Sequence, residues 1–284
     1  MRYGFYLPTR GPLATPESLE QLVQRAEALG FSSVVIADHI VQPVTIESKY
    51  PYTVSGAFSG TGDSLEQLAL MAYIAAKTSK LRLITSVMIV PHRNPLVTAK
   101  SLATIDVLSG GRVTVGVGVG WLREEFAALH APDFDRRGAV TNEYLRIFKT
   151  VWTQAPASFT GEFYAFGEIW CLPQPVQKPH PPIVLGGAFP WAARRAVRYG
   201  DGWYPNAASG DPEEYLPAFR RMAAEKGREP LPVRIGGAPE DADKLKRYRD
   251  LGAAAVNVTL MSDKRDDILP VLDRWEKLNR QVNG

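Results

Sequence analysis

The sequence is poor in cysteine and has no long hydrophobic run. Cys171 is the single cysteine among 284 residues, which excludes a disulfide within the chain and any zinc site made of several thiolates. No apolar stretch approaches the length of about 18 residues that spans a membrane, and the apolar run that ends at Pro8 is too short for the core of a signal peptide. We therefore expect a cytoplasmic protein without a membrane anchor.

Charge of one sign is not concentrated anywhere in the chain. The 33 basic and 30 acidic residues give a net charge of +3 and form no block of the kind that follows a phosphate backbone. The histidines also lack the H-x-H or H-x-x-x-H spacing of a metal hydrolase; they are His39, His92, His130 and His180. These absences favour a small-molecule substrate and argue against nucleic acid and a metal.

Short apolar runs alternate with segments of helical period about every 30 residues, as βα units require. The clearest helix signal is TPESLEQLVQRAEALG, with Thr15 as N-cap, Pro16 at the first position and Gly30 after the last. Asp63 is expected to cap the next helix. Strands are predicted at residues 2–8, 32–38, 81–89, 112–120, 182–187, 202–206, 232–237 and 253–260. Eight strands with eight helices favour a closed (β/α)8 TIM barrel, an α/β fold, over a doubly wound open sheet.

Two segments interrupt this pattern. Residues 40–62 contain Pro43, Pro51 and three glycines, and form a longer connection than most, which is typical of functional loops. Residues of about 155–181 are rich in aromatics and proline and are expected to form a hairpin-like insertion in the second half of the barrel. We expect residues 1–284 to make one domain.

Barrel enzymes carry their chemistry at the carboxyl ends of the strands. The run RVTVGVGVGWLREEF places Gly116, Gly118 and Gly120 on one face of a strand. Missing side chains there would let a flat molecule such as a cofactor ring approach the backbone, with close packing against a neighbouring element as the alternative. Trp121 interrupts the glycine pattern of a dinucleotide site. Residues 186–188, GGA before a helix, predict either an anion site or an ordinary turn.

These motifs resemble the bacterial luciferase-like monooxygenases, and within them the branch that uses coenzyme F-420, a deazaflavin, instead of FMN. The resemblance covers nearly the whole chain and rests on SSVVIADHI, LITSVMIVPHRNPLVTAKSLATIDVLSGGRVTVGVGVGWLREEF, PPIVLGGA and LGAAAVNVTL. It implies a (β/α)8 barrel with an insertion in the second half. Dimers are common in the family, so a homodimer is expected, with the apolar helices after the second and third strands as a candidate interface.

The resemblance also implies residue roles. His39 matches the histidine beside the reactive carbon of the cofactor, and is expected to be the catalytic proton donor or acceptor; a residue that only holds its loop is the alternative. Ser86 and Val87 match a non-prolyl cis peptide that lies against the ring. The positions expected to bind the cofactor are Asp38, Ser86, Val87, Gly116, Gly118, Gly186, Gly187 and Ala188.

One position departs from the family pattern. In the sugar-phosphate dehydrogenases of this branch the glycine motif ends in a glutamate that acts with the histidine, and Trp121 stands there in this chain. Glu124 and Glu125 lie one helical turn further on as candidates to replace it. Trp121 and Glu124 are expected in the substrate pocket, with core packing as the alternative for Trp121. The cationic side chains expected near the acidic tail of the cofactor, unless they are ordinary surface arginines, are Arg10 and Arg93.

The sequence therefore predicts an oxidoreductase that transfers a hydride between coenzyme F-420 and an unidentified small organic substrate. An FMN-dependent monooxygenase of the same fold is the alternative. A barrel that binds a flavin or deazaflavin without catalysis is an alternative of another class, and Trp121 in place of an acid supports it.

Overall fold

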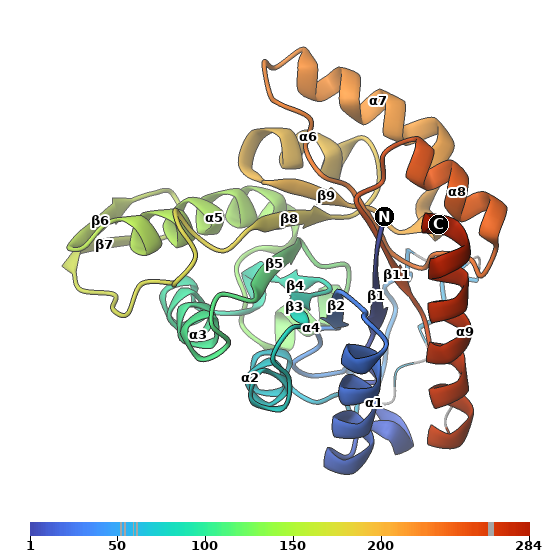
Figure 1. Cartoon of the computed structure of the whole chain (residues 1–284). Helices are drawn as coiled ribbons and strands as arrows, with labels where there is room; N and C mark the ends of the chain where they lie inside the picture. Colours follow the sequence, from blue (N-terminus) through green and yellow to red (C-terminus); the bar gives the residue numbers. More distant parts are fainter. Residues whose placement is uncertain (52, 54, 59, 61, 261–263) are drawn as a thin grey trace.

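A computed structural model describes residues 1–51, 53, 55–58, 60, 62–260 and 264–284. Eight parallel strands in the order β10-β11-β1-β2-β3-β5-β8-β9 surround a central axis (Figure 1). Bridges from Trp203 to Val233 and from Asn206 to Gly236 join β9 to β10 and close the ring. The strands are β1 Arg2–Tyr6, β2 Ser33–Ile36, β3 Arg82–Thr85, β5 Val113–Gly118, β8 Ile183–Gly186, β9 Gly202–Tyr204, β10 Arg234–Ile235 and β11 Ala255–Val258. The predicted α/β barrel is confirmed, and the open sheet is excluded.

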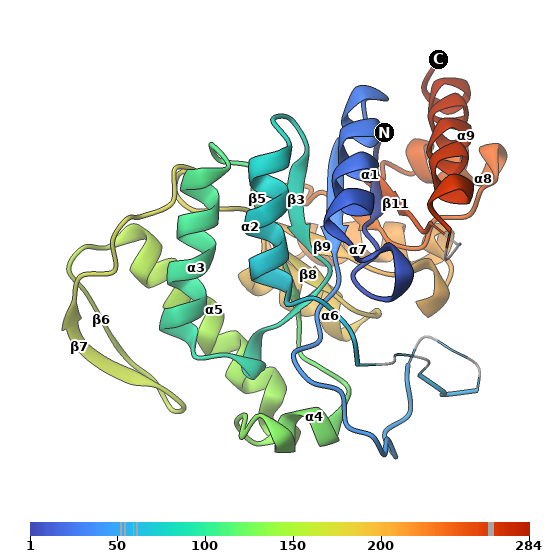
Figure 2. The ribbon, with the colours of Figure 1, turned by 90° about the horizontal axis from the view of Figure 1, so that it is seen from below.

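Helices cover the outside of this barrel (Figures 1 and 2). They are α1 Pro16–Ala28, α2 Gln67–Lys77, α3 Pro95–Leu108, α5 Arg137–Thr153, α6 Trp191–Tyr199, α7 Pro212–Ala224, α8 Ala242–Asp250 and α9 Arg265–Asn283. The short helix α4 Arg123–Ala128 lies instead beside the connection after β2 (Figure 2). The ends of α1 are as predicted, because Thr15 Oγ1 accepts a hydrogen bond from the Ser18 amide (3.3 Å) and Gly30 has φ +78°. None of the described helices is long and apolar enough to cross a membrane.

The prediction that Asp63 caps the second helix is wrong. Helix α2 begins at Gln67, and the carboxylate of Glu66 accepts a hydrogen bond from the Ala69 amide (2.7 Å). Asp63 instead accepts one from the amide of Gly11 (2.7 Å), because the chain before α2 is still extended alongside the segment after β1. The short helix α4 was not among the eight predicted helices.

The third predicted strand, residues 81–89, is interrupted. Strand β3 ends at Thr85, the Ser86-Val87 peptide bond is cis, and a separate short strand, β4 Met88–Ile89, pairs with β5. The segment predicted as an insertion carries an antiparallel pair, β6 Ala157–Thr160 and β7 Ala165–Ile169, which projects from the side of the barrel beside α5 in both views (Figures 1 and 2).

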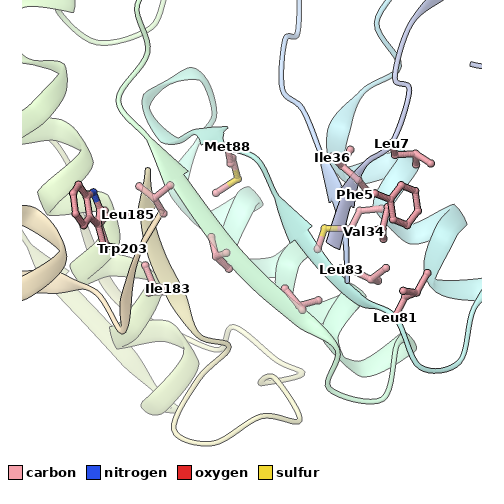
Figure 3. Packing of buried hydrophobic residues seen from close by; sticks show 14 of the residues in the cluster. Phe5, Leu7, Val34, Ile36, Leu81, Leu83, Met88, Ile183, Leu185 and Trp203 are labelled. Atoms are coloured by element: carbon pink, nitrogen blue, oxygen red, sulfur yellow. The ribbon is translucent and has the colours of Figure 1, made fainter. Parts of the chain in front are cut away.

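Apolar side chains fill the layer between strands and helices (Figure 3), among them Phe5, Val34, Ile36, Leu83 and Trp203. Because strand residues alternate between faces, the neighbouring positions point into the barrel, and these include polar ones. Ser33, Tyr204, Arg234 and Asn257 are joined there by hydrogen bonds. The barrel interior is thus partly polar beneath its carboxyl end.

The outer face of α3 exposes large apolar side chains. Val97 is 64% and Leu108 is 68% exposed, and both border a groove shared with α2. These are the helices after the second and third strands, where the sequence places a homodimer interface. The oligomeric state stays a prediction.

Candidate active site

A cavity of roughly 520 Å³ opens at the carboxyl ends of the barrel strands. Residues of β1, β4, β8 and β9 and of the connections after β1, β2, β3, β5, β8, β9 and β11 line it. Barrel enzymes have their active sites at this end, and the volume lies within the range of about 300–1,000 Å³ typical of small-molecule sites. Seven of the predicted site residues line the cavity: Asp38, His39, Ser86, Val87, Trp121, Gly186 and Gly187.

His39 is held by a buried carboxylate. Its Nδ1 lies 2.9 Å from Oε2 of Glu125, a residue of α4 with 0% exposure. The other oxygen, Oε1, accepts hydrogen bonds from the amides of Ile40 (2.9 Å) and Val41 (3.3 Å). An ionised carboxylate can only accept, so Nδ1 carries the proton, and in the neutral imidazole Nε2 is the free acceptor. Glu125 therefore fixes both the orientation and the tautomer of His39.

The ionisation of Glu125 is favoured by its partners. Burial alone would raise the pKa of its carboxyl, but the hydrogen bond from His39, the nearby His92 and the amide of Ile40 lower that pKa below its usual value. Glu125 is therefore a carboxylate at neutral pH. The sequence named it only as one of two candidates, because spacing alone does not show which of two adjacent glutamates faces the barrel.

A second histidine lies on the other side of Glu125. His92 is buried, with its Nδ1 3.9 Å from Oε1 of Glu125 and its ring 4.6 Å from that of Phe126. Neither ring nitrogen has a hydrogen-bond partner among the described residues. Burial lowers the pKa of His92 to about 4 in spite of the nearby carboxylate, so the ring is neutral at pH 7.

Asp38 is engaged within the fold although it lines the cavity. Its Oδ2 accepts hydrogen bonds from the Ile89 amide and from Arg93, and its Oδ1 accepts another from Arg93, all at 2.8 Å. Arg93 also contacts Glu66 (2.7 Å) and is not among the described residues that line the cavity. Arg10 does line it, with its guanidinium 5.3 Å from the ring centre of Phe58.

The glycines of β5 make room for protein atoms. A Cβ atom on Gly116 would overlap the carbonyl oxygen of Thr85, and one on Gly118 would lie 2.6 Å from Cγ2 of Val87. Gly186 is similarly close to Val87, at 2.5 Å from Cγ1. Close packing thus accounts for the missing side chains at these three positions, because glycine there leaves room for residues 85–87 to lie against β5 and β8.

Three aromatic side chains form a wall of the cavity. The connection between β2 and α2 carries Tyr50 and Phe58, which meet Trp121 with ring centres 5.1 and 5.2 Å away. Phe58 also lies 5.1 Å from the ring of His39. Trp121 therefore belongs to the cavity wall, on the side of the predicted proton carrier.

Glu124 holds this connection in place. Its Oε1 accepts hydrogen bonds from the amides of Glu47 (2.8 Å) and Ser48 (2.9 Å), and its Oε2 accepts one from the Ser48 hydroxyl (2.7 Å). Burial would raise the pKa of Glu124, but these hydrogen bonds lower it to about 2. Figure 2 shows the segment passing α4 before it returns to α2. Glu124 thus fixes the connection between β2 and α2, and it is not among the described residues that line the cavity.

The sequence model of one protein family, the luciferase-like monooxygenases, matches residues 1–239. The chain belongs to this family. An uncharacterized protein of Mycobacterium tuberculosis, Rv0953c, is 35% identical over 96% of this chain and 97% of its own. The FMNH(2)-dependent dimethylsulfone monooxygenase of Pseudomonas putida is 37% identical over 53% of this chain and 42% of its own.

Among solved structures, an F420-dependent secondary alcohol dehydrogenase in complex with an F420-acetone adduct superposes with a TM-score of 0.77. It covers 100% of this chain and 99% of its own at 17% identity, which shows a shared fold. The family model, which matches most of the chain, confirms the predicted family resemblance.

The cavity fits the type of cofactor that luciferase-like proteins use. Its apolar walls include Leu7, Leu13 and Ile89, which suit a flat ring. Arg93 is already paired with Asp38 and does not line the cavity. Arg10 does, so its guanidinium is the positive charge that a phosphate or carboxylate of such a cofactor would meet. A flat ring with an anionic tail describes both coenzyme F-420 and FMN. No group of three described histidine, cysteine or acidic side chains is arranged to hold a metal ion.

Four predicted site residues lie outside the cavity lining as the structure describes it. Gly116 and Gly118 are buried in β5, Glu124 faces the connection after β2, and Ala188 is exposed before α6. The cofactor contacts assigned to the glycines and to Ala188 stay predictions. Tyr6, Tyr204 and Asn206 line the cavity without having been named from the sequence, since single tyrosines at strand ends carry no motif.

Proposed function

We propose that this luciferase-like protein is an oxidoreductase that transfers a hydride between coenzyme F-420 and a small organic substrate, with His39 as proton carrier. The pairing of His39 with the buried carboxylate of Glu125 at the cavity carries this proposal. Reduction of a carbonyl, or oxidation of an alcohol, moves one proton together with each hydride. A neutral imidazole with a fixed tautomer can accept or return that proton near pH 7.

The chain's own residues have distinct tasks in this reaction. When bound, F-420 supplies the hydride donor or acceptor. His39 Nε2 takes the proton from an alcohol substrate, and the resulting imidazolium is stabilised by Glu125 through Nδ1. Tyr50, Phe58 and Trp121 shield that side of the cavity from water, and Glu124 holds the connection that carries Tyr50 and Phe58 in place. Removing water strengthens the charge interaction between His39 and Glu125.

An FMN-dependent monooxygenase is the second candidate. The 37% identity to the dimethylsulfone monooxygenase over 53% of this chain favours it. The same cavity and the same histidine would serve it.

The test is a turnover screen with variants of the pair. Purified protein is assayed with oxidised and reduced F-420 against alcohols, aldehydes and ketones, and with reduced FMN for oxygen uptake. In Glu125→Gln the amide oxygen still accepts from Ile40 and Val41, so the NH2 group faces His39 and imposes the opposite tautomer. We expect kcat to fall by about 100-fold to 10,000-fold in this variant and in His39→Ala, with cofactor affinity nearly unchanged.

The matched control is His130→Asn, which removes an exposed histidine at φ +49°, a conformation that asparagine tolerates. It should turn over like the wild type. Unchanged turnover in both Glu125→Gln and His39→Ala would contradict the proposed role of the pair. Oxygen uptake with reduced FMN, and none of the F-420 reactions, would assign the protein to the second candidate.

A further inference from the structure

A chain of hydrogen bonds runs through the barrel interior to the floor of the cavity. It begins at Arg234 of β10, whose Nη1 donates to Ser33 Oγ (2.9 Å) and to Asn257 Oδ1 (2.7 Å). Asn257 Nδ2 in turn donates to the hydroxyl of Tyr204. That hydroxyl lies 2.9 Å from Ser86 Oγ and 3.1 Å from the hydroxyl of Tyr6.

The cation fixes the direction of the first two links. A guanidinium has donors only, so the amide oxygen of Asn257 must face Arg234 and its NH2 group must face Tyr204. Within the described part of the chain no carboxylate pairs with Arg234. Burial lowers its pKa only to about 10, so it stays charged at neutral pH. The chain of hydrogen bonds therefore starts from the positive charge of Arg234, and its donors point towards the cavity.

At the cavity end of this chain of hydrogen bonds, the number of hydroxyl protons limits which group can donate. The Tyr204 hydroxyl has one proton and two acceptor sites, and Asn257 occupies one of these sites. Only one of Ser86 and Tyr6 can donate into the remaining site, and the other receives the proton of Tyr204. The hydroxyl that receives is left with a proton of its own. In the observed geometry Tyr204 donates to Tyr6. Ser86 also interacts with the Tyr6 hydroxyl, so a substrate oxygen in the cavity would compete with Ser86 for the Tyr6 proton.

We propose that Tyr6 is a hydrogen-bond donor for a carbonyl or alkoxide oxygen of the substrate, and that Arg234, Asn257 and Tyr204 are positioning residues that direct its proton into the cavity. This assignment rests on the proposed function, because hydride transfer to a carbonyl carbon places negative charge on the adjacent oxygen. Donors aimed at the atom where charge develops are strong contributors to catalysis. Tyr6 lies at the end of β1, beside β2, which leads to His39.

The test pairs two ligands of the same shape with two variants. Acetophenone carries the oxygen acceptor, and α-methylstyrene has a CH2 group in its place; both are flat and suit the wall of Tyr50, Phe58 and Trp121. Their dissociation constants are measured by calorimetry with protein saturated with oxidised F-420. Wild-type protein should bind acetophenone about fivefold to tenfold more tightly than α-methylstyrene.

Two variants should bring this ratio close to one for different reasons. Tyr6→Phe removes the donor. Asn257→Asp keeps the shape and the contact with Arg234, but a carboxylate accepts from Tyr204, which frees both acceptor sites of Tyr204 for Ser86 and Tyr6. No proton is then left over for the cavity. A purely structural role for Asn257 predicts no such change, since the isosteric side chain still bridges Arg234 and Tyr204.

The matched control is Tyr3→Phe. Tyr3 is on the same strand but on the opposite face, where its ring packs 6.3 Å from Trp275. Its buried hydroxyl has no described partner, so this variant should keep the wild-type ratio. An equal ratio for wild type, Tyr6→Phe and Asn257→Asp would overturn the proposal. A fivefold loss of F-420 affinity in both variants with an unchanged ligand ratio would overturn the assignment to the substrate, since the donor would then serve the cofactor.

Failure of the proposed function gives a different result. If wild-type protein does not bind F-420, that function fails, and the same ligand ratio measured without cofactor still tests the donor.

Discussion

Burial of the neutral His92 makes the stability of the protein depend on pH. In the unfolded chain a histidine has a pKa of about 6.5, whereas burial lowers the pKa of His92 to about 4 in the folded protein. Between these two values the unfolded state binds a proton that the folded state does not. The contribution of His92 to the free energy of unfolding is therefore complete above about pH 6.5 and is lost as the pH falls towards 4.

The size of this effect follows from the two pKa values. One pKa unit corresponds to about 1.4 kcal/mol, so the full loss is about 3 kcal/mol, of which about 2 kcal/mol falls between pH 7 and pH 5. The assay is urea unfolding at pH 7, 6 and 5, followed by tryptophan fluorescence, for wild-type protein and His92→Leu. Titratable groups that do not contact His92 affect both proteins alike, so the difference in unfolding free energy reports His92 together with its effect on Glu125.

The wild type should lose about 2 kcal/mol more than His92→Leu between pH 7 and pH 5, whatever the variant does to stability at pH 7. His130→Asn is the control and should follow the wild-type curve, because His130 is exposed. Parallel curves for wild type and His92→Leu would refute the reasoning, since His92 would then take up its proton in the folded state as easily as in the unfolded one.

Two further predictions concern β5 and the connection after β2. Gly116→Ala should lower the free energy of unfolding by about 1–3 kcal/mol, because its Cβ would overlap the Thr85 carbonyl oxygen. Gly167→Ala, where no atom lies within 4 Å of the new Cβ, should change it by less than about 0.5 kcal/mol; equal urea midpoints for the two would refute the packing argument. Glu124→Ala should speed tryptic cleavage after the exposed Lys49 by about tenfold or more, since three hydrogen bonds to a carboxylate are lost. An unchanged cleavage rate on gels would show that Glu124 does not hold the segment.

Periodicity and capping signals were sufficient to predict the barrel. Each βα unit shows its own local pattern, and Thr15, Pro16 and Gly30 mark the ends of α1 as they do in the structure. Tertiary contacts decided what local signals could not. Asp63 has a typical capping side chain, yet it is bound to the amide of Gly11, a residue 52 positions away in the sequence.

The candidate site was predicted only in part for the same reason. His39, Ser86 and Trp121 follow strands directly, so their place at the cavity could be expected from topology. The choice between Glu124 and Glu125 depends on the turn of α4, which no motif encodes. The glycine alternation indicated a close approach but not its partner, which is residues 85–87 for Gly116 and Gly118. The polar chain from Arg234 to Tyr6 joins four strands and is invisible to sequence spacing.

The most direct test of the proposed function is a fluorescence titration of the purified protein with coenzyme F-420 and, separately, with FMN, each oxidised and reduced, at fixed salt. We predict micromolar or tighter binding of F-420 and binding of FMN at least ten times weaker, a difference of about 1.4 kcal/mol. The reverse preference would contradict the deazaflavin assignment and favour the monooxygenase, and binding of neither cofactor would contradict both.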